Sequence, residues 1–186
     1  SNGKILPVHV FIGIDTASSV SDSADYTVIM PIAIDEQNNR YILPLIRERA
    51  VPSKVLDRIV QENKRWVPRH IRMLIGGQEE IYADVLRNLE QENIRLLTTR
   101  PKVAKEKLYL EGLEPWFYRK KVFLLHSQGN LRSELLEFTT DGKHRHDDQI
   151  DAMYAAFKGS YPPVDVVQTD KEVKNTLSTK YSWQTA

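Results

Sequence analysis

Cysteine is absent from this sequence of 186 residues. That absence excludes disulfides, zinc sites made of thiolates and cysteine nucleophiles. A metal ion in this protein would therefore be held by carboxylates, with or without histidine. Oxygen ligands favour hard ions such as Mg²⁺ or Mn²⁺.

Long apolar runs and phosphate-binding loops are missing as well. No uninterrupted apolar stretch approaches the length of about 18 residues that a transmembrane helix needs. No segment matches the G-x-x-x-x-G-K-S/T pattern, which excludes nucleotide hydrolysis by that route. Residues 1–7 lack the pattern of a signal peptide and are interpreted as a tag remnant or linker. The length suits one domain, expected at residues 8–160, and the polar segment 161–186 is expected to be a C-terminal extension with some flexibility.

Excess charge of one sign is also lacking, because the formal net charge is only +1. The composition as a whole therefore does not indicate a nucleic-acid partner. Basic residues nevertheless gather in the middle of the chain, and on charge alone a solvated face is their simplest interpretation. These residues are Arg95, Arg100, Lys102, Lys105, Lys107, Arg119, Lys120 and Lys121.

The order of apolar patterns predicts an α/β fold. Three strands with short links are expected at residues 8–14, 26–34 and 41–47, with Pro31 suggesting a bulge or an edge position in the second. Helical spacing begins at Ser53, and short strands at 71–75, 94–97 and 122–125 then alternate with helices. These helices are expected near residues 81–89, after Pro101, at 131–138 and at 150–157. An antiparallel meander followed by this alternation predicts an RNase H-like mixed β-sheet flanked by helices.

Asp15 is the first candidate site residue. It ends an apolar segment that reads as a central, buried strand. A carboxylate there is costly unless it is paired, hydrogen-bonded or bound to a metal. An Asx-turn or a helix cap at the end of the strand explains it equally well, so both interpretations stay open.

The start of the last predicted helix carries a second group of acids. Asp147, Asp148 and Asp151 fall within about 100° of one another on a helical wheel, beside the apolar stripe rather than opposite it. Attraction to the helix dipole accounts for one or two such acids but poorly for three. Hydrolysis of a phosphodiester by two divalent ions about 4 Å apart needs several converging carboxylates. We therefore expect these acids and Asp15 to form one site.

A second strand-end acid is expected after residues 71–75, but Gly76-Gly77-Gln78 stands there. Glu79 and Glu80 follow within one turn and are the candidates for this position. Acids at the start of a helix more commonly complement its dipole, and the carbonyl oxygen of Gln78 is an alternative ligand.

These segments resemble one known family. I-G-I-D-T-A at residues 12–17 and S-A-D-Y-T at 23–27 resemble the opening of the C-terminal nuclease domain of large terminase subunits from tailed phages. L-R-S-E-L-L-E-F at 131–138 and H-D-D-Q-I-D-A at 146–152 resemble its closing motifs. R-P-K-V-A-K-E-K at 100–107 is similar to its basic helix, and the resemblance covers most of residues 8–158.

The resemblance implies a metal-dependent endonuclease that cuts concatemeric double-stranded DNA into genome lengths in the host cytoplasm. It implies two Mg²⁺ or Mn²⁺ ions and, as partners, an ATPase motor domain, a small terminase subunit and a portal protein. By matching position, Asp15 and Asp147 or Asp148 are the implied metal ligands, with Asp151 nearby as a further metal residue. The family usually has Glu or Asp at the strand end after residues 71–75, so either Glu79 or Glu80 takes this catalytic position or the site is altered. The implied contacts to DNA phosphates are Arg100, Lys102, Lys105 and Lys107.

Two other functions fit the same patterns. A RuvC-like Holliday junction resolvase shares the strand-end aspartate and the late acidic helix. An inert RNase H-like module for DNA binding or assembly is consistent with the missing strand-end acid after residues 71–75. Metal binding would distinguish the inert module from the two enzymes.

Overall fold

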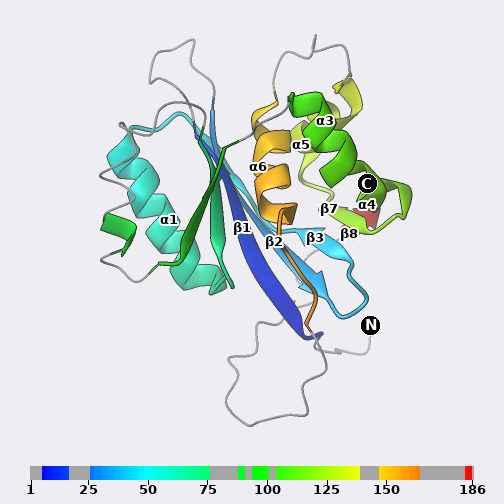
Figure 1. Ribbon diagram of the computed structural model, residues 1–186, viewed down its shortest axis with the longest axis horizontal. Helices are drawn as coiled ribbons and strands as arrows, with labels where there is room; N and C mark the ends of the chain where they lie inside the picture. Colours follow the sequence, from blue (N-terminus) through cyan, green and yellow to red (C-terminus); the bar gives the residue numbers. More distant parts are fainter. Residues whose placement is uncertain are drawn as a thin grey trace.

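The computed structural model describes residues 6–16, 26–75, 88–90, 94–100, 104–138, 147–163 and 183–185 (Figure 1). No helix in these ranges is long and apolar enough to cross a membrane. The strands are β1 (Val8–Asp15), β2 (Thr27–Asp35), β3 (Arg40–Ile42), β4 (Ile46–Glu48), β5 (Ile71–Leu74), β6 (Leu96–Thr99), β7 (Val122–Leu125) and β8 (Trp183–Thr185). The helices are α1 (Pro52–Trp66), α3 (Lys105–Gly112), α4 (Glu114–Tyr118), α5 (Gly129–Glu137) and α6 (Asp148–Phe157).

All eight described strands join one mixed sheet in the order β6-β5-β1-β2-β3-β7-β8, with β4 also paired to β2. β1, β2 and β3 form the expected antiparallel meander. β5 pairs with β1, β6 with β5 and β7 with β3 in parallel. β8, from the predicted C-terminal extension, pairs antiparallel with β7. The RNase H-like mixed sheet predicted from the sequence is confirmed.

The third predicted strand, at residues 41–47, was wrong in one respect. It is interrupted around Pro44, which cannot donate a backbone hydrogen bond, and so becomes the two short strands β3 and β4. Pro31 also differs from the prediction, because it lies within the central strand β2 rather than at an edge. It is tolerated opposite this interruption, since β3 pairs with residues 32–34 and β4 with residues 27–29.

Alternation along the strands divides the core into two layers. Ile12, Ile14 and Ile29 point to one face, where they pack against Val55 and Ile59 of α1. The opposite face is covered by α6, with α3, α4 and α5 around it (Figure 1). The last predicted helix was expected to bury one stripe, but all ten residues of α6 are buried because the sheet and its neighbouring helices enclose it.

Gly13 allows α6 to touch the backbone of β1. A Cβ atom at this position would lie 2.0 Å from the carbonyl oxygen of Ala152 and 2.4 Å from the backbone nitrogen of Ala156. The far end of α6 is fixed by Arg72 of β5, whose Nε donates to the Lys158 carbonyl at 3.0 Å. The start of α6 is thereby held beside the end of β1.

We expect Gly13→Ala to lower the free energy of unfolding by about 3 kcal/mol or more, because overpacking here forces two backbones apart. Gly129→Ala is the matched control, since a Cβ at Gly129 meets no atom within 4 Å. Urea denaturation of both variants measures the effect. Equal stability of the two variants would contradict the close approach.

Candidate active site

Asp15 lies at the end of β1 on the face covered by α6. It is paired across the sheet with Val28 of β2, and Val28 is paired with Arg47 of β4. Residues opposite one another on neighbouring strands point to the same face, so Asp15 and Arg47 flank the start of α6. A carboxylate and a guanidinium from distant parts of the chain thus border the same site.

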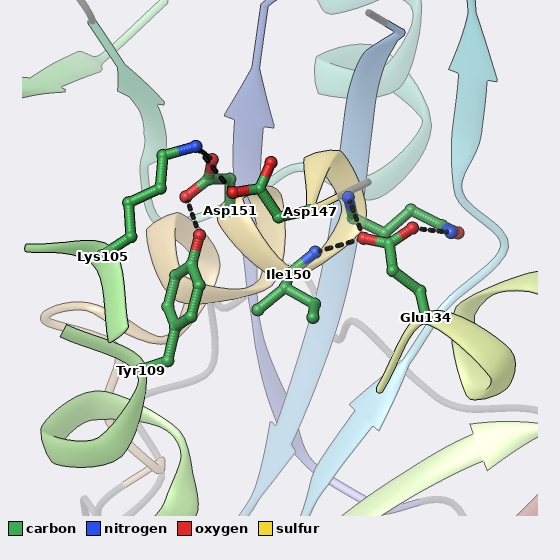
Figure 2. A network of polar contacts seen from close by, with 7 residues as sticks. Lys105, Tyr109, Glu134, Asp147, Ile150 and Asp151 are labelled. Carbon is green, nitrogen blue, oxygen red and sulfur yellow. Dashed lines mark hydrogen bonds and ion pairs between the residues drawn. The ribbon is translucent and has the colours of Figure 1, made fainter. Parts of the chain in front are cut away.

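Three further aspartates come from the start of α6. Asp147 is its N-cap residue, while Asp148 and Asp151 lie in its first turn and are only 3% and 4% exposed. The ammonium of Lys105, from α3, donates to Asp147 Oδ2 at 2.8 Å and to Asp151 Oδ2 at 2.5 Å (Figure 2). Lys105 therefore lies between two of the acids as their counter-ion.

The second oxygen of Asp151 is also engaged. The hydroxyl of Tyr109, one turn after Lys105 on α3, donates to Asp151 Oδ1 (Figure 2). Burial and the charge of Asp151 raise the pKa of Tyr109 far above its ordinary value, so this hydroxyl keeps its proton. α3 thus fixes the orientation of the Asp151 carboxylate from one side.

Asp148 faces a different cation. Its Oδ2 lies 3.5 Å from Nη2 of Arg47. The guanidinium of Arg47 stacks on the ring of Tyr26, 3.7 Å from its centroid. The acids at the start of α6 are therefore divided between two basic groups, Lys105 on one side and Arg47 on the other.

The site carries more negative than positive charge, and this shifts the pKa values of its residues. Burial raises the pKa of Asp15 well above that of an ordinary aspartate, and the charges of Asp151, Asp148 and Asp147 raise it further, while Lys105 opposes them. Burial also raises the pKa of Asp151, again against Lys105. Burial alone would lower the pKa of Lys105, but its two carboxylate partners raise it overall. The ammonium therefore stays charged at neutral pH.

Glu134 of α5 caps the amino end of α6. Its Oε1 accepts from the backbone N–H groups of Gln149 at 2.8 Å and Ile150 at 3.1 Å, and its Oε2 accepts from Gln149 Nε2 at 2.6 Å (Figure 2). A carboxylate at the amino end of a helix satisfies donors that have no partner within the helix. The motif at residues 131–138 thus supplies the cap that orients Asp147 and Asp148.

The structure brings four of the predicted site residues together, namely Asp15, Asp147, Asp148 and Asp151. Of the predicted DNA contacts, Lys105 is exposed but its ammonium bonds two of these acids, whereas Arg100 and Lys107 are exposed and Lys107 lies 3.7 Å from Glu111. Glu79, Glu80 and Lys102 lie outside the described residues. The sequence did not indicate Arg47 or Tyr109, and it gave Glu134 only as part of the motif at residues 131–138, because their roles depend on contacts between separate elements.

The donor chemistry of this site suits a hard divalent cation. Carboxylate oxygens of Asp147 and Asp151 already share one cation, the Lys105 ammonium, and Asp15 lies within the same field of negative charge. Within the described ranges, no three acidic or histidine side chains converge closely enough to hold an ion in the present arrangement. The carboxylates thus have the chemistry that a hard divalent cation needs. In this structure, Lys105 donates hydrogen bonds to two of them.

A known family model matches most of the chain. The model of the terminase RNaseH-like domain matches residues 12–158, which include Asp15 and the whole of α6. The chain belongs to the terminase RNaseH-like domain family. No curated protein sequence matches this terminase domain.

Solved structures agree on the fold. The large terminase nuclease of the thermophilic phage G20c has a TM-score of 0.64 and 20% identity, with 83% of each chain covered. The yeast mitochondrial Holliday junction resolvase gives a TM-score of 0.49 and 16% identity, over 82% of this chain and 79% of the other. RuvC of T. thermophilus gives 0.44 and 13%, over 80% and 90%. Of these three structures, only the G20c nuclease has a TM-score above 0.5. With 20% identity, its similarity supports the RNase H-like fold.

We expect Glu134→Ala to destabilise the terminase domain by about 2–3 kcal/mol, because buried N–H groups at the start of α6 lose a charged acceptor. Glu137→Ala is the control on the same helix, since Glu137 is exposed. Thermal or urea unfolding measures the loss. A similar loss in both variants would show that Glu134 does not act through α6.

The raised pKa of Asp15 predicts a dependence of stability on pH. A folded-state pKa above the unfolded value of about 3.9 means that stability is lost as pH rises through the folded pKa. Asp15→Asn should therefore stabilise the metal-free domain at pH 7, by about 1.4 kcal/mol for each unit of elevation. This gain should disappear below about pH 4, where both states of the wild type are protonated.

Urea denaturation in the presence of a chelator, at several pH values, measures this difference. Asp57→Asn serves as control, because Asp57 is an exposed acid on α1. A gain in stability that is the same at every pH would contradict the assignment to Asp15.

Proposed function

We propose that this domain is a divalent-metal-dependent endodeoxyribonuclease that cuts concatemeric viral DNA into genome lengths. One observation carries the proposal. Asp15 of β1 and three aspartates at the start of α6 are brought into one field of negative charge, although Asp15 is more than 130 positions from the others in the sequence. Asp148 and Asp151 are buried, and acids so close together destabilise one another unless a cation stabilises them. The match to the terminase family supports a catalytic metal ion as that cation.

Asp15, Asp147, Asp148 and Asp151 are the proposed ligands of Mg²⁺ or Mn²⁺. Bound divalent ions activate a water molecule and stabilise the leaving oxygen in hydrolysis of a phosphodiester. The chain itself holds the acids in place: Glu134 fixes the start of α6 and Tyr109 orients Asp151. Glu79 and Glu80 remain candidates for a further ligand.

Lys105 has a double role in this proposal. Its ammonium and a divalent ion compete for the same oxygens of Asp147 and Asp151. In the metal-free domain, Lys105 stabilises the acids and keeps the site assembled. Once displaced, its charged end remains near the site, where it can contact a phosphate of the substrate.

Binding of double-stranded DNA is proposed to involve Arg100, Lys102 and Lys107 along with Lys105. Contacts to phosphates give affinity that falls with salt and carry little sequence information, so little cleavage preference is expected. An ATPase motor domain, a small terminase subunit and a portal protein in the host cytoplasm are the proposed partners, in keeping with the terminase family.

Cleavage of supercoiled plasmid tests the proposal. With Mn²⁺ or Mg²⁺, the wild-type domain should nick and linearise the plasmid, and a chelator should abolish both reactions. Asp15→Asn and Asp148→Asn should each slow cleavage by more than about 100-fold, since each removes a ligand charge. Asp57→Asn, on the opposite face of the sheet, should leave the rate unchanged.

Cleavage that survives both site substitutions would contradict the proposed site, and absence of cleavage by the wild type would contradict the nuclease. A branched substrate adds a further comparison. Strong preference for a four-way junction over linear duplex would favour a resolvase instead.

A further inference from the structure

A cavity of about 380 Å³ lies beside the acid cluster. The segment between β3 and β4 forms one wall with Pro44 and Leu45, and the first residues of α5, Gly129 and Asn130, form another. Its volume falls within the range of about 300–1,000 Å³ that is usual for small-ligand sites. It is therefore large enough to hold a small molecule or one unit of a polymer.

The cavity and the acid cluster share a wall. Arg47 and Gln149 both line the cavity, and Arg47 also contacts Asp148 at 3.5 Å. Gln149 immediately follows Asp148 in α6. A ligand in the cavity is thus separated from the acids by a single layer of side chains.

The chemistry of the lining is divided. Arg47 supplies positive charge, its side chain is 22% exposed, and its Nε meets no hydrogen-bond acceptor among the described residues. Pro44 and Leu45 supply apolar surface, while Asn130 offers an amide donor and acceptor. An anionic group beside an apolar ring matches this combination, and a nucleotide has both.

We propose that this cavity binds one nucleotide of the substrate strand next to the phosphate that is cut. The nucleotide's phosphate contacts Arg47, and its sugar or base lies against Pro44 and Leu45. This inference rests on the proposed function, which it deepens by naming where the strand is held. Arg47 then links the bound strand to Asp148.

Two substitutions test the cavity separately from catalysis. Gly129→Leu narrows it, because Gly129 lines the cavity and a Cβ at this position meets no atom within 4 Å. Arg47→Met removes its charge. Arg65→Met is the matched control, since Arg65 is a half-exposed arginine of α1, on the opposite face of the sheet.

Fluorescence anisotropy with a labelled DNA duplex and its single strand, in a chelator that prevents cleavage, measures binding. Gly129→Leu should weaken binding at least about tenfold without changing the salt dependence. Arg47→Met should weaken binding and also lower the slope of log K against log salt by about 1, for one lost phosphate contact. Arg65→Met should bind like the wild type.

Competition identifies the occupant. A deoxynucleoside monophosphate should displace the labelled DNA from the wild type at a much lower concentration than inorganic phosphate does, and Gly129→Leu should abolish that difference. Equal competition by the deoxynucleoside monophosphate and inorganic phosphate would overturn the proposed nucleotide site. The cavity would then be a site for a simple anion. Circular dichroism confirms that each variant is folded, and if Gly129→Leu is not, Arg47→Met still decides the charge contact.

DNA binding by the variants tests the cavity, and plasmid cleavage by the wild type tests the nuclease, so the two proposals can fail separately. If the wild type cleaves plasmid but Gly129→Leu and Arg47→Met bind DNA normally, the cavity plays no part and the proposed function stands. If both variants lose binding while the wild type never cleaves, the cavity binds nucleotides in a domain that is not a nuclease.

Discussion

The contact between α6 and β1 at Gly13 governs the rest of the site. Because Gly13 has no side chain, the backbone at Ala152 and Ala156 lies directly on the strand. This places the first turn of α6 beside the end of β1, where Asp15 meets Asp151 and its neighbours. Packing that brings helix and sheet so close also excludes water, which makes a buried carboxylate costly unless a cation or a hydrogen-bond donor lies beside it.

The charges are arranged around that contact in an ordered way. Lys105 neutralises Asp147 and Asp151 from α3, and Arg47 reaches Asp148 from β4. Three aspartates face these two bases, and Asp15 adds a fourth acid. The site therefore retains an excess of negative charge. Under the proposed function, a divalent ion would balance the remaining charge. The proposed nucleotide site beyond Arg47 lies next to the same acids.

Much of this was predictable from the sequence. The meander, the later strands and the acid group at residues 147–151 follow from local periodicity, and local periodicity is strongest where strands and helices are buried. The break at Pro44 and the central position of Pro31 were missed because they depend on how neighbouring strands pair. The contact of Lys105 with the acids and the cap from Glu134 were missed for a similar reason, since each contact joins residues 15 or more positions apart. Glu79 and Glu80, the candidates for the strand-end acid after residues 71–75, lie outside the described residues.

Anomalous diffraction from a crystal of the domain soaked in Mn²⁺ locates the proposed metal site. We expect an anomalous peak bounded by Asp15 and the aspartates at the start of α6, with the ammonium of Lys105 withdrawn from Asp147 and Asp151. A peak elsewhere on the molecule, or none while Lys105 still bonds both carboxylates at saturating Mn²⁺, would contradict this site.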